Sequence, residues 1–267
     1  MSTKEKFAKN KVLFNTLIAV GLILILLATV YFTRAYPVVL VGNKFIFLSE
    51  VDSSIAIAKK LDPNSDKQKV YEQVIANAKK EQLVSNVDIA DEFKFYTTGR
   101  ADEYRKFLND YFSGDEKLFK KLVVAPKAFD AKLAIKYNSN FGLNNDAYNK
   151  ASNVISKLNE GQSFEELAKT YSDDKISGQL GGDLGFVQPG QLLPELEKAV
   201  AASTFGEVKK QIVISRLGYH IIFPMAVADK DGQKITHLKH ILITTSGYEN
   251  WLAEQLNKIG VHKFIGI

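Results

Sequence analysis

The first regular pattern in the chain is an uncharged apolar run over residues 12–32. At 1.5 Å rise per residue, a helix of this length covers roughly the 30 Å of a bilayer core, which predicts a transmembrane helix. Residues 1–11 carry four lysines, whereas the next cation after the run is Arg34. The positive-inside rule therefore predicts a cytoplasmic N-terminus, a single-pass cell-membrane protein, and extracytoplasmic domains after the span.

Residues 33–127 have mostly helical spacing. The exception is the start, where "VVLVGNKFIF" predicts a short strand pair around Gly42 and Asn43. Ser49 and Ser65 are candidate helix caps, and Pro126 is expected to end the helical run. Apart from the strand pair, the pattern predicts a helical module whose aromatic stripe is either ordinary core or an open groove for unfolded segments.

The pattern changes over residues 128–228, where short strands alternate with helices. Strands are expected at "AKLAIKY", "KKQIVIS" and "GYHIIFPMAV", and Ser163 with Glu166 is a candidate capping box for a helix. Residues 229–267 then read as a turn, a strand "KITHLKHILITT" and an amphipathic helix. Together these elements predict an α+β fold with an antiparallel sheet.

Composition and charge exclude several kinds of chemistry. The chain has no cysteine, which excludes disulfides, zinc thiolate sites and thiol nucleophiles. The formal net charge is +5, and most of it comes from the lysines and Arg34 that flank the apolar run. The remainder is almost neutral, so a nucleic-acid partner is not expected.

Residues 177–199 combine five glycines and two prolines with isolated apolar positions. "GGDLG" offers no Lys for a phosphate loop, lacks the setting of a dinucleotide fold and does not space its carboxylates as a calcium loop does. The remaining interpretation is that the glycines bend the chain so that apolar side chains converge on a concave surface. Those side chains are Leu184, Phe186, Leu192 and Leu196.

The segments "FEELAKTYSDDKISGQLGGDLGFVQPGQLLPELEKAV" and "GEVKKQIVISRLGYHII" resemble the parvulin type of peptidyl-prolyl cis/trans isomerase. The resemblance covers about residues 129–225. It implies a four-stranded antiparallel sheet with surrounding helices and a reaction that needs no metal or cofactor. Residues 33–127 resemble more loosely the all-α chaperone region of extracytoplasmic foldases such as SurA.

The resemblance also implies roles for single residues. Leu184, Leu192 and Leu196 fall at positions of the pocket for the proline ring, with Phe186 and Gln191 in the surrounding loop. Plain core packing is the alternative for each leucine.

Two polar residues match the family's site. Asp174 falls where relatives carry a Cys or Asp beside the substrate carbonyl, although an Asp there can simply cap a short helix. His220 matches the histidine that holds the polar network of the family's site. The alternative, an ordinary buried histidine with satisfied hydrogen bonds, would look much the same.

The sequence departs from the family at its first strand, where Leu133 replaces a histidine. A matching "HIL" occurs instead near the C-terminus, with His240. Two interpretations remain open: His240 lies on an additional strand without a catalytic role, which antiparallel pairing through "DKDG" favours, or it replaces the missing partner of His220. His237 and His240 would point to opposite faces of a strand, so no zinc pair is expected, and His262 has no evident companions.

The sequence thus predicts a membrane-anchored extracytoplasmic foldase that isomerises X-Pro bonds. Its expected partners are unfolded or nascent proline-containing polypeptides, together with the membrane through residues 12–32. The alternatives are a holdase chaperone without isomerase activity, motivated by Leu133, and a membrane scaffold that docks one fixed partner.

Overall fold

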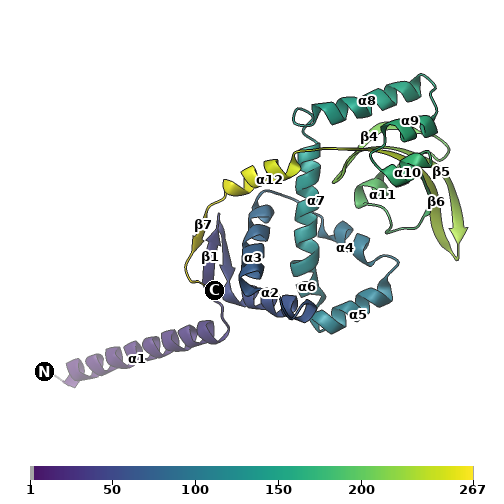
Figure 1. Ribbon diagram of the computed structural model, residues 1–267. Coiled ribbons are helices and arrows are strands. Elements are labelled where there is room, and N and C mark those ends of the chain that lie inside the picture. Colours follow the sequence, from purple (N-terminus) through teal and green to yellow (C-terminus); the bar gives the residue numbers. More distant parts are fainter. Residues whose placement is uncertain (1–2, 267) are drawn as a thin grey trace. The chain divides into compact units, whose positions relative to one another are not determined.

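The computed structural model describes the backbone of residues 3–266 and the side chains of residues 18–266 (Figure 1). The chain forms two compact units. The first comprises the residues up to Ala78 together with those from Ile259 onward, and the second is Lys79–Lys258. The first unit is therefore built from both ends of the sequence.

The first unit contains a small sheet with helices. Its helices are α1 (Thr3–Phe32), α2 (Leu48–Leu61) and α3 (Lys67–Gln82, which runs on past Ala78). Strands β1 (Pro37–Val41), β2 (Lys44–Phe47) and β7 (Val261–Lys263) form an antiparallel sheet in the order β2-β1-β7. The core of the unit includes Val39, Ile46, Tyr71 and Val74.

This architecture confirms the predicted strand pair, but the description of the N-terminal module as all-α is wrong. The chain returns at β7 to complete a sheet, a pairing that no local pattern indicates. The proposed caps are also wrong. Helix α2 starts at Leu48, before Ser49, and the carboxylate of Asp66, not the hydroxyl of Ser65, accepts a hydrogen bond from a backbone N–H in the first turn of α3.

The transmembrane helix predicted over residues 12–32 falls within α1. Within the part of the chain that the structure describes, there is no helix whose length and apolar character would let it cross a membrane. The side chains of residues 12–17 lie outside the described residues.

The second unit begins with a helical segment. It consists of α4 (Ile89–Thr97), α5 (Ala101–Phe112), α6 (Glu116–Phe119), a π-helical turn η1 (Lys120–Val124) and α7 (Ala125–Asn138). Aromatic rings from α4, α5 and α6 pack against one another, and Phe112 and Phe119 are almost fully buried. This packing favours the core interpretation of the aromatic stripe.

Helix α7 corrects two sequence predictions. The stretch "AKLAIKY", expected to be a strand, is helical, and Leu133 is completely buried on that helix. Pro126 lies in the first turn of α7 and does not end a helix. The physical reasons are that alanine, lysine and leucine favour helix, and that proline is tolerated where the first-turn N–H groups have no helical partner.

The rest of the second unit is an α+β arrangement, as predicted. Its helices are α8 (Asn145–Asn159), α9 (Phe164–Tyr171), α10 (Lys175–Gln179), α11 (Pro194–Ala201) and α12 (Tyr248–Asn257). Its strands are β3 (Asp183–Val187), β4 (Lys209–Ser215), β5 (Gly218–Lys230) and β6 (Gln233–Thr244). The hydroxyl of Ser163 caps α9, as its sequence context indicates.

The four strands form an antiparallel sheet in the order β3-β6-β5-β4. Strand β6 is the last of these four strands in the sequence but lies between β3 and β5. It forms a long hairpin with β5 that is evident in Figure 1. The fourth strand of the sheet is therefore β6 and not residues 131–137.

The two faces of this sheet are covered by different elements. On one face, Tyr219, Ile221, Ile241 and Ile243 pack against residues of α8 and α9. On the other, Ile222, Leu238 and Val213 pack against Leu196 and Val200 of α11. The second face also carries His220 and His240.

Candidate active site

His220 and His240 lie on neighbouring strands and on the same face of the sheet. In the register of β5 and β6, His220 is opposite Leu242 and His240 is opposite Ile222. Side chains that alternate along each strand therefore place both imidazoles on the face covered by α11. Their Nδ1 atoms are 3.4 Å apart, and both residues are buried.

Asp174 is placed against His240 by a helix cap. Its Oδ1 accepts hydrogen bonds from the backbone N–H groups of Ile176 and Ser177 at the start of α10. Its Oδ2 lies 2.9 Å from Nε2 of His240 and accepts a hydrogen bond of 2.6 Å from the hydroxyl of Ser177. Asp174 therefore caps α10 through one carboxylate oxygen and contacts His240 through the other, so both interpretations of this residue apply.

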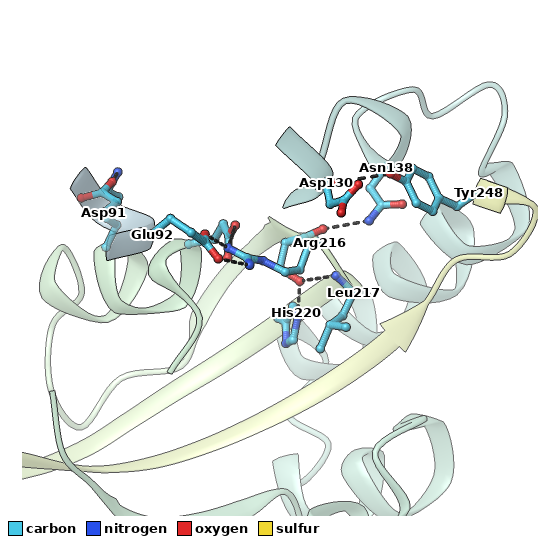
Figure 2. A network of polar contacts seen from close by, with 11 residues as sticks. Asp91, Glu92, Asp130, Asn138, Arg216, Leu217, His220 and Tyr248 are labelled. Carbon is cyan, nitrogen blue, oxygen red and sulfur yellow. Dashed lines mark hydrogen bonds and ion pairs between the residues drawn. The ribbon is translucent and has the colours of Figure 1, made fainter. Parts of the chain in front are cut away.

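Ser215 is the partner of His220 at the other end of this group. Its Oγ lies 2.8 Å from Nε2 of His220 and accepts a hydrogen bond of 3.0 Å from the backbone N–H of Leu217. Ser215 ends β4, so its position depends on the turn between β4 and β5. Figure 2 shows His220 and Leu217 within a larger polar network that also includes Asn138 and Arg216.

The hydrogen-bond partners assign one consistent set of tautomers. An ionised Asp174 only accepts, so Nε2 of His240 donates to it and Nδ1 of His240 is unprotonated. Nδ1 of His220 then donates to His240, and Nε2 of His220 accepts from the Ser215 hydroxyl. From Ser215 through His220 and His240, each group thus donates a hydrogen bond to the next, and the last acceptor is Asp174. The carboxylate of Asp174 is the only charged group among these four residues.

The electrostatics agree with two neutral imidazoles. Burial lowers the pKa of His220 to about 3, and the neighbouring His240 acts in the same direction. Burial also lowers the pKa of His240, although the carboxylate of Asp174 opposes this shift. For Asp174 burial acts to raise the pKa, but hydrogen bonds from Ser177 and His240 outweigh it and the pKa falls to about 2.

One glycine of the quoted stretch lets the backbone approach β6. Gly182 has φ +83°, and its carbonyl accepts a hydrogen bond of 2.8 Å from the backbone N–H of His240. A Cβ at this position would lie 2.4 Å from the carbonyl oxygen of His240. Any side chain would therefore push the glycine loop away from the strand that carries His240.

An apolar cluster lies next to the histidines on the same face. Val213 is opposite His220 in the sheet, Ile222 is opposite His240, and both belong to the cluster that contains Leu196. Leu184 and Leu192 are partly buried against this cluster. The three predicted pocket leucines thus come together at one place beside the polar group.

Phe186 and Gln191, the two residues predicted for the loop around the pocket, are more exposed than the three leucines. Phe186 is half exposed, and its ring is tilted against that of His237. His237 lies on the opposite face of the sheet from His240 because the two are three residues apart on β6. Gln191 is exposed, and its side chain accepts a hydrogen bond of 2.7 Å from the backbone N–H of Gln188. His262 lies on β7 in the first unit, against Phe264.

The polar group also includes Ser177, Ser215 and Asn138, which are all buried and which were not predicted from the sequence. The side-chain amide of Asn138 donates to the carbonyl of Ser215, and its backbone carbonyl accepts from the hydroxyl of Tyr219. Only Ser177 had a local signal, since it lies three residues after the cap Asp174. Among the described side chains there is no group of three or more His, Cys, Asp or Glu that could hold a metal ion.

Comparison with known families assigns a class to this arrangement. Residues 135–225 match the family model described as Rotamase, PPIC-type PPIASE domain. The matched segment contains Asp174, His220 and the three pocket leucines but ends before His240. It supports a peptidyl-prolyl isomerase of the PPIC type, the enzyme class expected from the sequence.

Two curated proteins and one solved structure are among those similar to this chain. The chain is 30% identical over 179 residues to foldase protein PrsA 2 of Bacillus cereus, covering 61% of this chain and 62% of that protein. It is 42% identical over 86 residues to chaperone SurA of Chromohalobacter salexigens, covering 32% of this chain but 19% of that protein. A crystal structure of the peptidylprolyl isomerase PrsA from Bacillus anthracis covers 70% of this chain and 85% of its own, with 23% identity and a TM-score of 0.24.

Proposed function

We propose that the protein is a foldase that isomerises X-Pro peptide bonds in unfolded or nascent polypeptides. The observation that carries this proposal is the hydrogen-bonded group from Ser215 through His220 and His240 to Asp174, next to a cluster with Leu184, Leu192 and Leu196. The cluster would hold the proline ring, and the polar group would lie beside the amide that twists. No metal or cofactor is required, because no covalent bond is made or broken.

The proposed chemistry is a lower barrier to rotation about the C–N bond. Amide resonance sets that barrier at about 18–20 kcal/mol, and the resonance form responsible has negative charge on the carbonyl oxygen. Asp174 is ionised and its side chain is 26% exposed, so it can approach a client carbonyl. A negative charge there disfavours the conjugated form, and a thousandfold acceleration needs only about 4 kcal/mol.

The direct test is the exchange rate between cis and trans proline in a peptide, measured by NMR with the purified chain. We expect acceleration by the wild type and a large loss in Leu196→Ala, which shortens the wall of the pocket. Phe186→Ala is the matched control, because Phe186 lies on the opposite face of the sheet. Equal exchange rates with and without the wild-type chain would refute the proposed activity.

A second pair of variants tests His240. His240→Asn should reduce the rate, because it breaks the link between His220 and Asp174, whereas His237→Asn should have little effect. Equal activity of His240→Asn and wild type would favour the interpretation of β6 as a strand without a catalytic role.

The holdase alternative loses its original motivation. Leu133 lies on α7 and not on a strand of the sheet, so it does not occupy the place of a site histidine. Suppression of client aggregation without any change in proline exchange would nevertheless support a holdase.

Location outside the cytoplasm and anchoring through residues 12–32 are also part of the proposal. Their support is the uncharged sequence of that run with lysines before it, together with relatives named as foldase and chaperone. If the proposal is correct, the chain will stay with membranes after alkaline extraction, whereas a variant without residues 1–32 will be released. Release of both would contradict anchoring.

A further inference from the structure

A helix outside the matched segment contacts the rim of the proposed site. Helix α4 ends at Thr97, well before residue 135, where the family match begins. Its Glu92 is almost fully buried, and both carboxylate oxygens accept hydrogen bonds from Arg216, at 2.9 Å from Nη1 and 2.8 Å from Nη2 (Figure 2). Arg216 therefore forms a bidentate salt bridge with a residue that lies outside the segment matched by the family model.

Arg216 is next to two parts of the site. It follows Ser215, whose hydroxyl is hydrogen-bonded to His220, and it lies in the turn between β4 and β5. Its Nη2 also donates a hydrogen bond of 3.2 Å to Glu195. Glu195 precedes Leu196, the most buried of the three pocket leucines, on helix α11. The guanidinium of Arg216, in the β4–β5 turn, therefore contacts both α4 and α11.

These contacts leave the guanidinium little freedom to move. The exposed fractions of the side chains are 17% for Arg216, 4% for Glu92 and 15% for Glu195. Burial alone would lower the pKa of Arg216, but the two carboxylates outweigh it and raise that pKa. Removing one partner would leave a buried charge only partly compensated, so the turn and α11 would have to shift to reach water or another partner.

We propose that Arg216 is a positioning residue of the isomerase site, and that Glu92 acts through it to fix the separation between the β4–β5 turn and helix α11. This inference rests on the proposed function. Arg216 does not touch the proline ring. It holds the Ser215 hydroxyl in line with His220 and holds Leu196 in the wall of the pocket.

The test compares two neighbouring residues of α4. Glu92→Gln removes the charge that faces Arg216. Asp91→Asn removes a carboxylate that pairs instead with Lys198 on the exposed side of α11. Displacement of a site by about 1 Å can cost up to a hundredfold in rate, so we expect kcat/KM to fall about tenfold or more in Glu92→Gln and less than about twofold in Asp91→Asn. Since the proposed function places Leu196 in the wall of the proline pocket, most of the loss should appear in KM.

A spectroscopic measurement separates positioning from general stability. Imidazole ¹⁵N shifts report the tautomer of His220, which should change in Glu92→Gln and stay constant in Asp91→Asn. If Glu92→Gln does not fold, Arg216→Lys is tested instead, because lysine keeps the charge but cannot form a bidentate salt bridge with Glu92. It should show the same rise in KM and the same change at His220.

The outcomes also separate this inference from the proposed function. Wild-type activity with unchanged KM and unchanged His220 shifts in the folded variant would overturn the role of Arg216 and leave the isomerase intact. An inactive wild type whose His220 shifts still respond to Glu92→Gln would refute the isomerase but support the positioning contact. An inactive wild type with no response at His220 would overturn both.

Discussion

Acidification should destabilise the folded chain through His220. The pKa of His220 in the folded protein is about 3, against 6.5 for an exposed imidazole. Between these values the unfolded state binds a proton that the folded state does not, so the free energy of unfolding falls as the pH falls below 6.5. From pH 7.0 to pH 5.5 this linkage amounts to about 1.3 kcal/mol for His220 alone.

Other groups of the site do not cancel this effect. The lowered pKa of His240 acts with the same sign. The pKa of Asp174 is about 2 in the folded state, so Asp174 stays ionised in both states over this range and contributes only below about pH 4. The loss on acidification should therefore be at least that of His220.

The assay is urea unfolding of the purified chain at both pH values, followed by circular dichroism. The free energy of unfolding should fall less between pH 7.0 and pH 5.5 in His220→Gln than in wild type, by about 1.3 kcal/mol, whatever the absolute stability of the variant. His262→Gln, an exposed change in the first unit, should retain the full difference. If the free energy of unfolding changes equally with pH in wild type and in His220→Gln, the neutral, buried state assigned to this histidine is refuted.

Three further predictions concern packing and chain extent. Leu196→Ala should lower the free energy of unfolding by about 2–5 kcal/mol, the usual cost of truncating a buried leucine, which chemical denaturation would measure. Gly182→Ala should unfold at a markedly lower temperature than wild type, because its Cβ would meet the carbonyl oxygen of His240 at 2.4 Å. A fragment of residues 135–225 should give no dispersed NMR spectrum, because it lacks β6 from the middle of the sheet, whereas residues 79–258 should give one. A folded short fragment, or an unaltered melting temperature in Gly182→Ala, would contradict these expectations.

Local patterns predicted much of the second unit correctly. Strands β4, β5 and β6 and the cap Ser163 follow from alternation and capping signals that act within a few residues. The convergence of Leu184, Leu192 and Leu196 was also expected from the glycine-rich stretch and the resemblance. These features depend on short-range geometry, which a sequence contains directly.

The failures occurred where helix and strand signals compete. Over residues 131–137 the local pattern suggested a strand, but the residue types favour helix, and α7 buries Leu133 completely. The resemblance implied a place for Phe186 in the loop around the pocket. A register shift in β3 between Asp183 and Phe186 places Phe186 instead opposite His237, on the other face of the sheet.

The sequence by itself determined the fold class, most of the strands, and the absence of thiol chemistry, since the chain has no cysteine. Only the tertiary structure decided which histidine stands beside His220, since that depends on β6 entering the sheet between β3 and β5. It also decided that Glu92 reaches Arg216 across more than a hundred residues of sequence. The reason is that strand order and buried ion pairs are set by how the whole chain packs, and neither leaves a pattern in neighbouring positions.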